Sequence, residues 1–295
     1  MQRDLNEWIG KRQVTEDEIS LTLVRRAAAM VNLDPATFKR GCDLPPHWYS
    51  MFFTPNARTP EIGHDGHPKK GDFLPPIPLP RRMFVGREVD FIRPLIVGEE
   101  ARKVSEITSI TPKSGRSGQL VFLQVKHTIE IGGKPAVVER QNVVYREAIK
   151  PGEASAAAGP ASDQGAEQPF SWEKEVTVDP VTLFRYSALT WNGHRIHYDA
   201  DYARNQEGYP GCVVNGALTL HLLIGAAIEH CVGRRLSRLS ARLSSPLFLG
   251  DTFRLCGRSL NERGDKLTMD ACAIGPGNRT AAMVQLQLDK NQRLA

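Results

Sequence analysis

The segment from Gly216 to Val232 constrains the fold more than any other part of the chain. It contains no proline, and apolar residues fall on nearly every face of the helix that it would form. A helix that is apolar all round must be surrounded by protein rather than laid on a surface. Strand-like runs follow it at 239–249, 252–260, 266–274 and 279–288. Alternation of apolar and polar residues in the last run is typical of a strand with one buried face. We therefore predict an α+β fold in which antiparallel strands wrap around a central helix, an arrangement known as a hotdog fold.

The first half of the chain repeats part of this pattern. The residues 94–102 and 246–254 share the sequence P-L-x-x-G-acid-x-x-R, each time after an alternating apolar run and between strand-like segments. Equivalent placement in both halves favours an internal duplication, and therefore a double hotdog. Between the halves, residues 150–169 are small and rich in proline and glycine, which is typical of a linker. This divides the chain into an N-terminal domain, 1–149, the linker 150–169, and a C-terminal domain, 170–295.

The first half matches the simple hotdog pattern less well than the second. Residues 16–32 are predicted to form an amphipathic helix, with Thr15 and Glu18 as its capping box. Strand-like runs follow at 82–93, 102–111, 119–131 and 135–147. A proline-rich segment, 43–80, is too long to be a plain connection, so it is either a functional lid or poorly ordered. Its aromatic residues favour a lid packed over something.

Composition narrows the class of protein. The formal charge of +5 on 295 residues is mild and spread out, so a small acidic molecule is a better partner than nucleic acid. The five cysteines are scattered without a CxxC pair, which favours a reducing compartment over a disulfide framework or zinc module. The polar N-terminus is not a signal peptide, and no apolar run is long enough to span a membrane. We expect a soluble cytoplasmic protein.

Chemistry is concentrated in residues 184–202. This segment holds two histidines, an asparagine, two arginines and two aspartates, and Asn215-Gly216 follows at the start of the apolar helix. A polar loop that carries titratable groups and leads into a buried helix is typical of an active site.

The same segment resembles a known motif. Residues 191–199, Trp-Asn-Gly-His-Arg-Ile-His-Tyr-Asp, are similar to the hydratase motif of the MaoC-like (R)-specific enoyl-CoA hydratases and 3-hydroxyacyl-thioester dehydratases. That motif has an acid, four residues, a histidine and then x-Asp. Residues 209–216 resemble the family's approach to the central helix, and residues 80–84, 115–118 and 145–146 resemble the N-terminal half of two-hotdog members. The branch most similar to this chain contains the mesaconyl-CoA and itaconyl-CoA hydratases.

The resemblance implies roles for three residues. His197 matches the catalytic histidine, a general acid and base whose ordinary pKa suits proton transfer near neutral pH. Gly216 matches the position whose backbone N–H binds the thioester carbonyl at a helix N-terminus. Asn192 stands where the family has a catalytic aspartate, and an amide cannot exchange a proton at neutral pH. Either His197 performs both transfers through a water held by Asn192, or a second acid, of which Asp199 is the nearest, takes part.

Further residues are candidates for binding the substrate. Arg195 or Arg82 could pair with a substrate carboxylate or with the phosphates of CoA. Tyr198 and Asn215 are also placed among the substrate-binding candidates, although Asn215 stands where many relatives have a histidine. Asp199 could instead be structural, at a helix start. His194 and His197 form a His-x-x-His pair, but no further ligands lie near them in the sequence, so we predict no metal.

The favoured interpretation is a hydro-lyase that reversibly hydrates an α,β-unsaturated acyl-CoA, of the branched dicarboxylic kind such as itaconyl- or mesaconyl-CoA. The alternatives are a 3-hydroxyacyl-thioester dehydratase of the fatty-acid type, a non-catalytic acyl-CoA-binding hotdog protein, and a thioesterase. We expect no cofactor beyond the CoA of the substrate, no nucleic-acid or membrane partner, and either a monomer or a homodimer.

Overall fold

The structure is a computed structural model that describes residues 5–115, 118–148 and 169–290. The strands before residue 150 are β1 Arg12–Glu18, β2 Arg81–Phe91, β3 Glu100–Gly115, β4 Gly118–Ile131 and β5 Lys134–Arg146. The strands after it are β6 Trp172–Thr177, β7 Arg234–Leu243, β8 Thr252–Arg263, β9 Lys266–Gly275 and β10 Arg279–Lys290. The α-helices are α1 Leu21–Met30, α2 Pro180–Leu189, α3 Ala200–Asn205 and α4 Gly216–Glu229. Short 3₁₀ helices include Pro46–Met51 and Arg195–His197.

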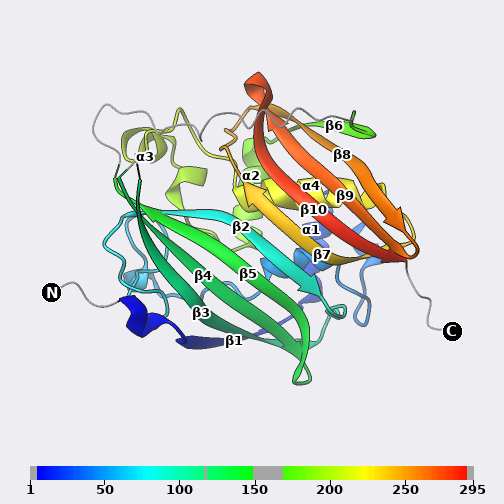
Figure 1. Ribbon diagram of the computed structural model, residues 1–295, viewed down its shortest axis with the longest axis horizontal. Coiled ribbons are helices and arrows are strands. Elements are labelled where there is room, and N and C mark those ends of the chain that lie inside the picture. Colours follow the sequence, from blue (N-terminus) through cyan, green and yellow to red (C-terminus); the bar gives the residue numbers. More distant parts are fainter. Residues whose placement is uncertain (1–4, 116–117, 149–168, 291–295) are drawn as a thin grey trace.

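All ten described strands join in one antiparallel sheet, in the order β1-β3-β4-β5-β2-β7-β10-β9-β8-β6. The order is symmetric about the seam between β2 and β7, where the two halves of the chain meet. The two halves of the sheet curve around the helices behind them (Figure 1). The predicted linker, 150–169, lies outside the described residues apart from its last position.

The second half has the predicted central helix. Helix α4 begins at Gly216 and ends at Glu229, and it packs against β7, β8, β9 and β10. Most of its leucines and alanines are buried against the inward-facing residues of those strands. The fully apolar sequence is thus explained by contacts on all sides.

The first half departs from the predicted helix at 16–32. Residues 12–18 form strand β1 along the edge of β3, and helix α1 begins only after Ser20. The predicted capping box of Thr15 and Glu18 is wrong, because both residues lie in β1 and the N-cap, Ser20, makes no side-chain capping bond. In the symmetric order, β1 and α1 correspond to β6 and α2 of the second half, neither of which was predicted.

The counterpart of α4 in the first half is much reduced. The N–H of Leu44 donates to the carbonyl of Leu95 (2.8 Å), just as that of Val214 donates to Leu247 (2.8 Å). After Val214 the chain enters the long helix α4, whereas after Leu44 it forms only the 3₁₀ helix Pro46–Met51. The prolines at 45 and 46 lack the N–H groups that a longer hydrogen-bonded helix needs in its interior. The repeat itself is visible as matching turns, with Gly98 at φ 92° and Gly250 at φ 89°.

Two further predictions are sharpened by the structure. The proline-rich segment 43–80 is neither free nor featureless, because Trp48, Tyr49, Phe52 and Phe53 are buried in the main core. The predicted strand 239–249 is shifted, since β7 spans Arg234–Leu243 and residues 246–250 form the turn of the repeat. No helix in the described parts of the chain is long and apolar enough to cross a membrane.

Candidate active site

A cavity of about 1320 Å³ is lined by residues from both halves of the chain. Five of the predicted site residues line it, namely Arg82, Asn192, His197, Asn215 and Gly216. The other three, Arg195, Tyr198 and Asp199, are not part of its wall.

His197 ends the 3₁₀ helix Arg195–His197 and is buried beside the cavity. Its Nδ1 lies 2.8 Å from the carbonyl oxygen of Val213, which can only accept, so Nδ1 carries the proton. Burial lowers the pKa of His197 to about 4, although the bond to Val213 opposes the shift. The imidazole is therefore neutral at pH 7, with Nε2 left as an unprotonated base.

The N-terminus of α4 forms another part of the wall. Asn215 caps the helix, because its Oδ1 accepts from the N–H of Ala217 at 3.0 Å. Its Nδ2 is buried without a partner in the part of the chain that the structure describes. Gly216 follows, and a Cβ there would lie 2.3 Å from Cδ1 of Leu243. The side chain of Leu243 therefore packs directly against Gly216, the first residue of α4.

Asn192 lies in the loop between α2 and His197. Its Oδ1 accepts from the N–H of His194 at 3.0 Å, which fixes the orientation of the amide. The side chain lines the cavity, and Nδ2 remains as a donor. Asn192 therefore both shapes the loop and offers two N–H donors to a bound molecule.

The three predicted residues outside the wall make contacts within the catalytic loop and at the start of α3. Arg195 donates from Nη2 to Asp199 at 2.7 Å and lies over the ring of Tyr202. Asp199 caps α3 by accepting from the N–H of Tyr202 at 2.9 Å. Tyr198 donates to the carbonyl of Gly193 and is 62% exposed. The position of Asp199 agrees with the structural alternative and does not bring it to the cavity as a second acid. Arg195 is committed to an ion pair away from the cavity, so its position does not support substrate binding.

The structure also places Asp65, His67 and His194 in the wall of this cavity, close to His197. Nδ1 of His67 donates to Oδ2 of Asp65 at 3.1 Å. The ring centroids of His67 and His194 are 4.1 Å apart, and those of His194 and His197 are 5.5 Å apart. Three histidine rings thus form a row that ends at His197. Sequence reasoning missed His67 and Asp65 because they belong to the proline-rich segment, more than a hundred residues away from His197.

Burial and neighbouring groups together set the protonation of Asp65, His67 and His194. Burial raises the pKa of Asp65, but hydrogen bonds from the side chain and backbone of His67 outweigh it and leave the pKa well below its ordinary value. Burial lowers the pKa of His67, against the bond to Asp65. Burial and the neighbouring His67 and His197 lower the pKa of His194 to about 2. Asp65 is therefore the ionised member, and the imidazoles beside it are neutral at pH 7.

Main-chain contacts hold this part of the proline-rich segment against the catalytic loop. The N–H of Arg195 donates to the carbonyl of Asp65 at 2.9 Å, and Nη1 of Arg195 donates to that of His64 at 3.2 Å. A Cβ on Gly66, which has φ +90°, would lie 1.8 Å from the carbonyl oxygen of Gly193. The first half of the chain thus clamps the loop that carries His197.

Asp65, His67 and His194 also have ligand atoms within 4.8 Å of one another, so by position they could hold a metal ion. The prediction of no metal considered only His194 and His197, and it did not include this cluster. Oδ2 of Asp65 and Nδ1 of His67 already bond to each other, which leaves His67 one ring nitrogen for any further ligand.

Arg82 lines the same cavity, and its charge lowers the pKa of both His67 and His194. Its neighbour Arg81 is paired with Glu207 at 3.0 Å. Arg82 is therefore placed where the sequence predicted a substrate-binding residue, with its role still a prediction.

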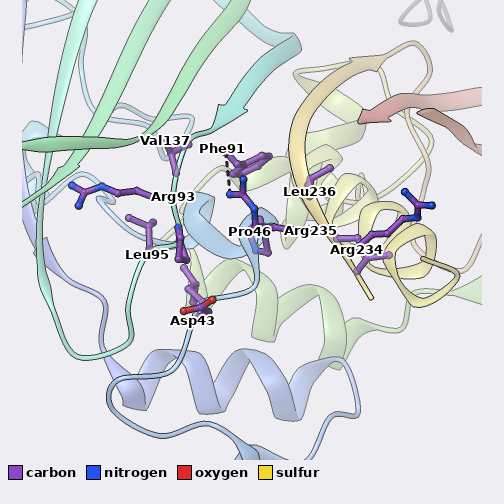
Figure 2. A pocket seen from close by; sticks show the side chains of 12 residues that line it. Asp43, Pro46, Phe91, Arg93, Leu95, Val137, Arg234, Arg235 and Leu236 are labelled. Atoms are coloured by element: carbon purple, nitrogen blue, oxygen red, sulfur yellow. Dashed lines mark hydrogen bonds between the residues drawn. The ribbon is translucent and has the colours of Figure 1, made fainter. Parts of the chain in front are cut away.

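A smaller cavity of about 200 Å³ lies at the other end of the seam. Figure 2 shows Asp43, Pro46, Leu95 and Leu236 around it, and Arg235 donates to the carbonyl of Phe91 across it at 3.4 Å. None of the predicted site residues lines this cavity.

Comparisons with known proteins agree with this architecture. The chain matches the model of the hydroxyacyl-thioester dehydratase type 2 family over residues 47–249. It is 40% identical to mesaconyl-C(4)-CoA hydratase of Chloroflexus aurantiacus over 97% of this chain and 98% of that protein. It is 34% identical to the mitochondrial hydroxyacyl-thioester dehydratase type 2 of Schizosaccharomyces pombe, over 32% of each chain.

Solved structures show the same fold at low sequence identity. A MaoC-like dehydratase superimposes with a TM-score of 0.70 at 17% identity, covering 97% of this chain and 99% of the other. A Mycobacterium tuberculosis protein with a double hotdog fold gives a TM-score of 0.59 at 12% identity, with 96% of both chains covered. The predicted α+β double hotdog and the predicted hydro-lyase class are confirmed. The chain belongs to the hydroxyacyl-thioester dehydratase type 2 family and is a hydro-lyase.

Proposed function

We propose that the protein reversibly adds water to a short dicarboxylic enoyl-CoA of the mesaconyl type. Support comes from the relative that shares 40% of its residues over nearly the whole chain. The observation that carries the proposal is the pairing of a neutral, buried His197 with the N-terminus of α4 in the wall of one cavity.

His197 is the base in the direction of hydration. Its Nε2 takes a proton from water, and the oxygen of that water bonds to the β-carbon of the substrate while the carbon–carbon double bond opens. Because Nδ1–H is held by Val213, the ring presents one nitrogen and keeps one tautomer. The imidazolium that forms returns a proton to the α-carbon, so His197 ends the cycle neutral.

The negative charge that develops between these steps falls on the thioester oxygen. The N–H of Gly216 and the dipole of α4 stabilise it there. A donor that is already in place costs no reorganisation, which is why such groups lower the barrier strongly.

Asn192 takes the place of the family's aspartate without exchanging a proton. Its Oδ1 is bonded to His194, so the amide presents donors that hold the oxygen of the water or of the product hydroxyl. The pair Asp65–His67 offers the alternative, a second titratable group in the same wall. Substitution of His67 separates these routes, because only the second one needs its imidazole.

The test is a substrate panel. Mesaconyl-C(4)-CoA, itaconyl-CoA and crotonyl-CoA are incubated with the protein, and the loss of enoyl absorbance is followed, beside a long-chain 3-hydroxyacyl-CoA in the reverse direction. We expect turnover of the dicarboxylic thioesters and its loss in His197→Ala. Absence of turnover with every thioester, or full activity of His197→Ala, would defeat the proposal. Release of free thiol would identify a thioesterase.

We further propose that the reaction needs no cofactor beyond the CoA of the substrate, since His197 and the N-terminus of α4 account for the proton and the charge. The cytoplasmic location and the choice between monomer and homodimer stay predictions, and the latter is checked by light scattering.

A further inference from the structure

Five polar side chains cross the inner face of the first half of the sheet. They are Arg87 on β2, Glu139 and Gln141 on β5, His127 on β4 and Lys103 on β3, and we call them the polar stripe. All five line the large cavity that also contains His197. The strands β2, β5, β4 and β3 are neighbours in the sheet, so the stripe is continuous.

The second half of the chain shows what these positions look like in an ordinary hotdog core. In the strand register, Arg87 of β2 lies opposite Gln141 of β5, just as Leu239 of β7 lies opposite Leu286 of β10. In the same way, His127 of β4 lies opposite Glu139 of β5, and Ala271 of β9 lies opposite Val284 of β10. By the same repeat, Lys103 corresponds to Leu255. The five counterparts are all apolar and buried in the core around α4: Leu239, Leu286, Val284, Ala271 and Leu255.

The polar stripe therefore occupies positions that are part of the hydrophobic core in the second half of the chain. Polar side chains are tolerated there because the first half has no long helix equivalent to α4 to cover them. In the second half α4 covers these positions, whereas in the first half only the 3₁₀ helix Pro46–Met51 follows the equivalent backbone. The uncovered face becomes the wall of the cavity. Five polar groups at five core positions, all facing one cavity, indicate a binding surface rather than a packing defect.

The charges of the stripe do not balance. Nη1 of Arg87 lies 3.5 Å from Oε1 of Glu139 and donates to the hydroxyl of Tyr49 at 3.2 Å. Nε of Arg87 is buried and has no hydrogen-bond partner among the described residues. Nζ of Lys103 donates to the carbonyl of Phe53 at 2.9 Å. Within the described chain, no carboxylate lies close enough to Lys103 to form an ion pair.

Glu139 is thus the one carboxylate of the polar stripe, beside the two cations Arg87 and Lys103. Burial lowers the pKa of Lys103, while the charges of Glu139 and Asp17 oppose the shift. A buried ammonium without a paired anion is costly, and an anionic group that enters the cavity would relieve that cost.

The stripe also lies near the reacting groups. Arg87 pairs across the seam with Ala241 of β7, and Leu243, two residues further along β7, packs against Gly216. Gly216 and the polar stripe line the same cavity, so an acyl group whose thioester is bound at Gly216 shares that cavity with the stripe.

We propose that the polar stripe binds the free carboxylate of a dicarboxylic acyl group, with Lys103 as its ion-pair partner and Arg87 as a second donor. The inference rests on the proposed hydratase function and adds the residues that select the substrate. It assigns catalysis to the second half of the chain and acyl selection to the first.

The experiment measures a ratio, namely kcat/KM for mesaconyl-C(4)-CoA divided by kcat/KM for crotonyl-CoA, which lacks the carboxylate. Loss of a charge-assisted bond predicts that Lys103→Met lowers this ratio about 10- to 100-fold, whereas Lys103→Arg keeps most of it. The matched control is Arg102→Met, which removes a cation from the adjacent position of β3, where Arg102 pairs at the surface with Glu130. It should leave the ratio as it is in the unmodified protein.

An equal loss on both substrates in Lys103→Met would show a structural role and overturn the inference, as would an unchanged ratio. If kcat/KM of the unmodified protein is the same for crotonyl-CoA and for the dicarboxylic thioester, the proposed carboxylate subsite is refuted while the hydratase function stands. If it hydrates neither, the proposed function itself fails.

Binding of unreactive thioesters keeps the inference testable should Lys103→Met fold poorly. Succinyl-CoA and butyryl-CoA have the same chain length and differ in the carboxylate. Glu139→Gln removes the competing anion, so we expect it to bind succinyl-CoA more tightly relative to butyryl-CoA. Weaker relative binding of succinyl-CoA would contradict the proposed charge balance.

Discussion

The contact between Gly66 and Gly193 gives the sharpest test of the clamp on the catalytic loop. In Gly66→Ala the new Cβ would lie 1.8 Å from the carbonyl oxygen of Gly193, where real contacts of this kind stay beyond 3.0 Å. The two segments must therefore part by about 1 Å. A displacement of that size in a catalytic loop typically costs on the order of 100-fold in rate.

Gly71→Ala is the matched control, because Gly71 lies in the same segment with φ +112° and has open space where a Cβ would be. Both variants carry the backbone strain of a side chain at positive φ, about 1–2 kcal/mol. Only Gly66→Ala also disturbs the two hydrogen bonds from Arg195 to Asp65 and His64, worth about 1 kcal/mol each.

We expect Gly71→Ala to lose about 1–2 kcal/mol in the free energy of unfolding and to keep its kcat. Gly66→Ala should lose about 2 kcal/mol more and about 100-fold in kcat. Urea unfolding followed by tryptophan fluorescence and steady-state hydration assays measure the two quantities. Equal behaviour of the two variants in both assays would refute the idea that the proline-rich segment positions the loop.

The remaining predictions concern the titratable groups. Because the pKa of His197 is lowered to about 4, its base form persists from pH 8 down to about pH 5, so kcat/KM should be constant over that range. At lower pH, kcat/KM should fall with a midpoint of about 4, as one proton binds to His197. A midpoint near 6.5 would contradict the burial argument. In Asn192→Asp the carboxylate can still accept from the N–H of His194 but cannot donate to the bound water, so activity should fall by more than about tenfold; activity within tenfold would show that the amide donors are not required. His67→Gln distinguishes the proton routes, since a kcat within tenfold supports His197 acting alone and a larger loss assigns a proton to the pair Asp65–His67. Burial lowers the pKa of His221 to about 4, so the stability that the neutral side chain contributes is complete above pH 6.5 and is lost as the pH falls toward 4. Through this group, the free energy of unfolding should be about 2 kcal/mol lower at pH 5 than at pH 7.5. His221→Leu should remove that part of the pH dependence.

The second half of the fold could be predicted because its signals are local. The helix at Gly216 is apolar on every face, and the strands after it alternate, so each element is encoded within its own sequence. The first half was harder for a physical reason. Residues 12–18 are polar and form an edge strand, where pairing with β3 rather than burial holds the conformation.

The candidate site divides in the same way. Asn192 and His197 lie in one motif, Gly216 begins the apolar helix that follows it in the sequence, and the structure places all three in the cavity wall. Asp65 and His67 reach it only through the docking of a distant segment, which no spacing along the chain encodes. Arg195 and Asp199 are four residues apart and form an ion pair with each other, which places Asp199 in its structural alternative at the start of α3 and leaves the role of Arg195 a prediction.

The symmetric strand order has a consequence for how such an enzyme can change. When two identical hotdog units pair, every substitution occurs twice, so a residue that improves one wall of a cavity also alters the equivalent core position of the partner. Here both units belong to one chain, and a lysine at position 103 leaves Leu255 untouched. The fused chain holds a single His197 motif, so it should bind one acyl-CoA per chain and saturate without cooperativity within it. A fused chain with one reaction centre can therefore vary the two walls of its cavity independently.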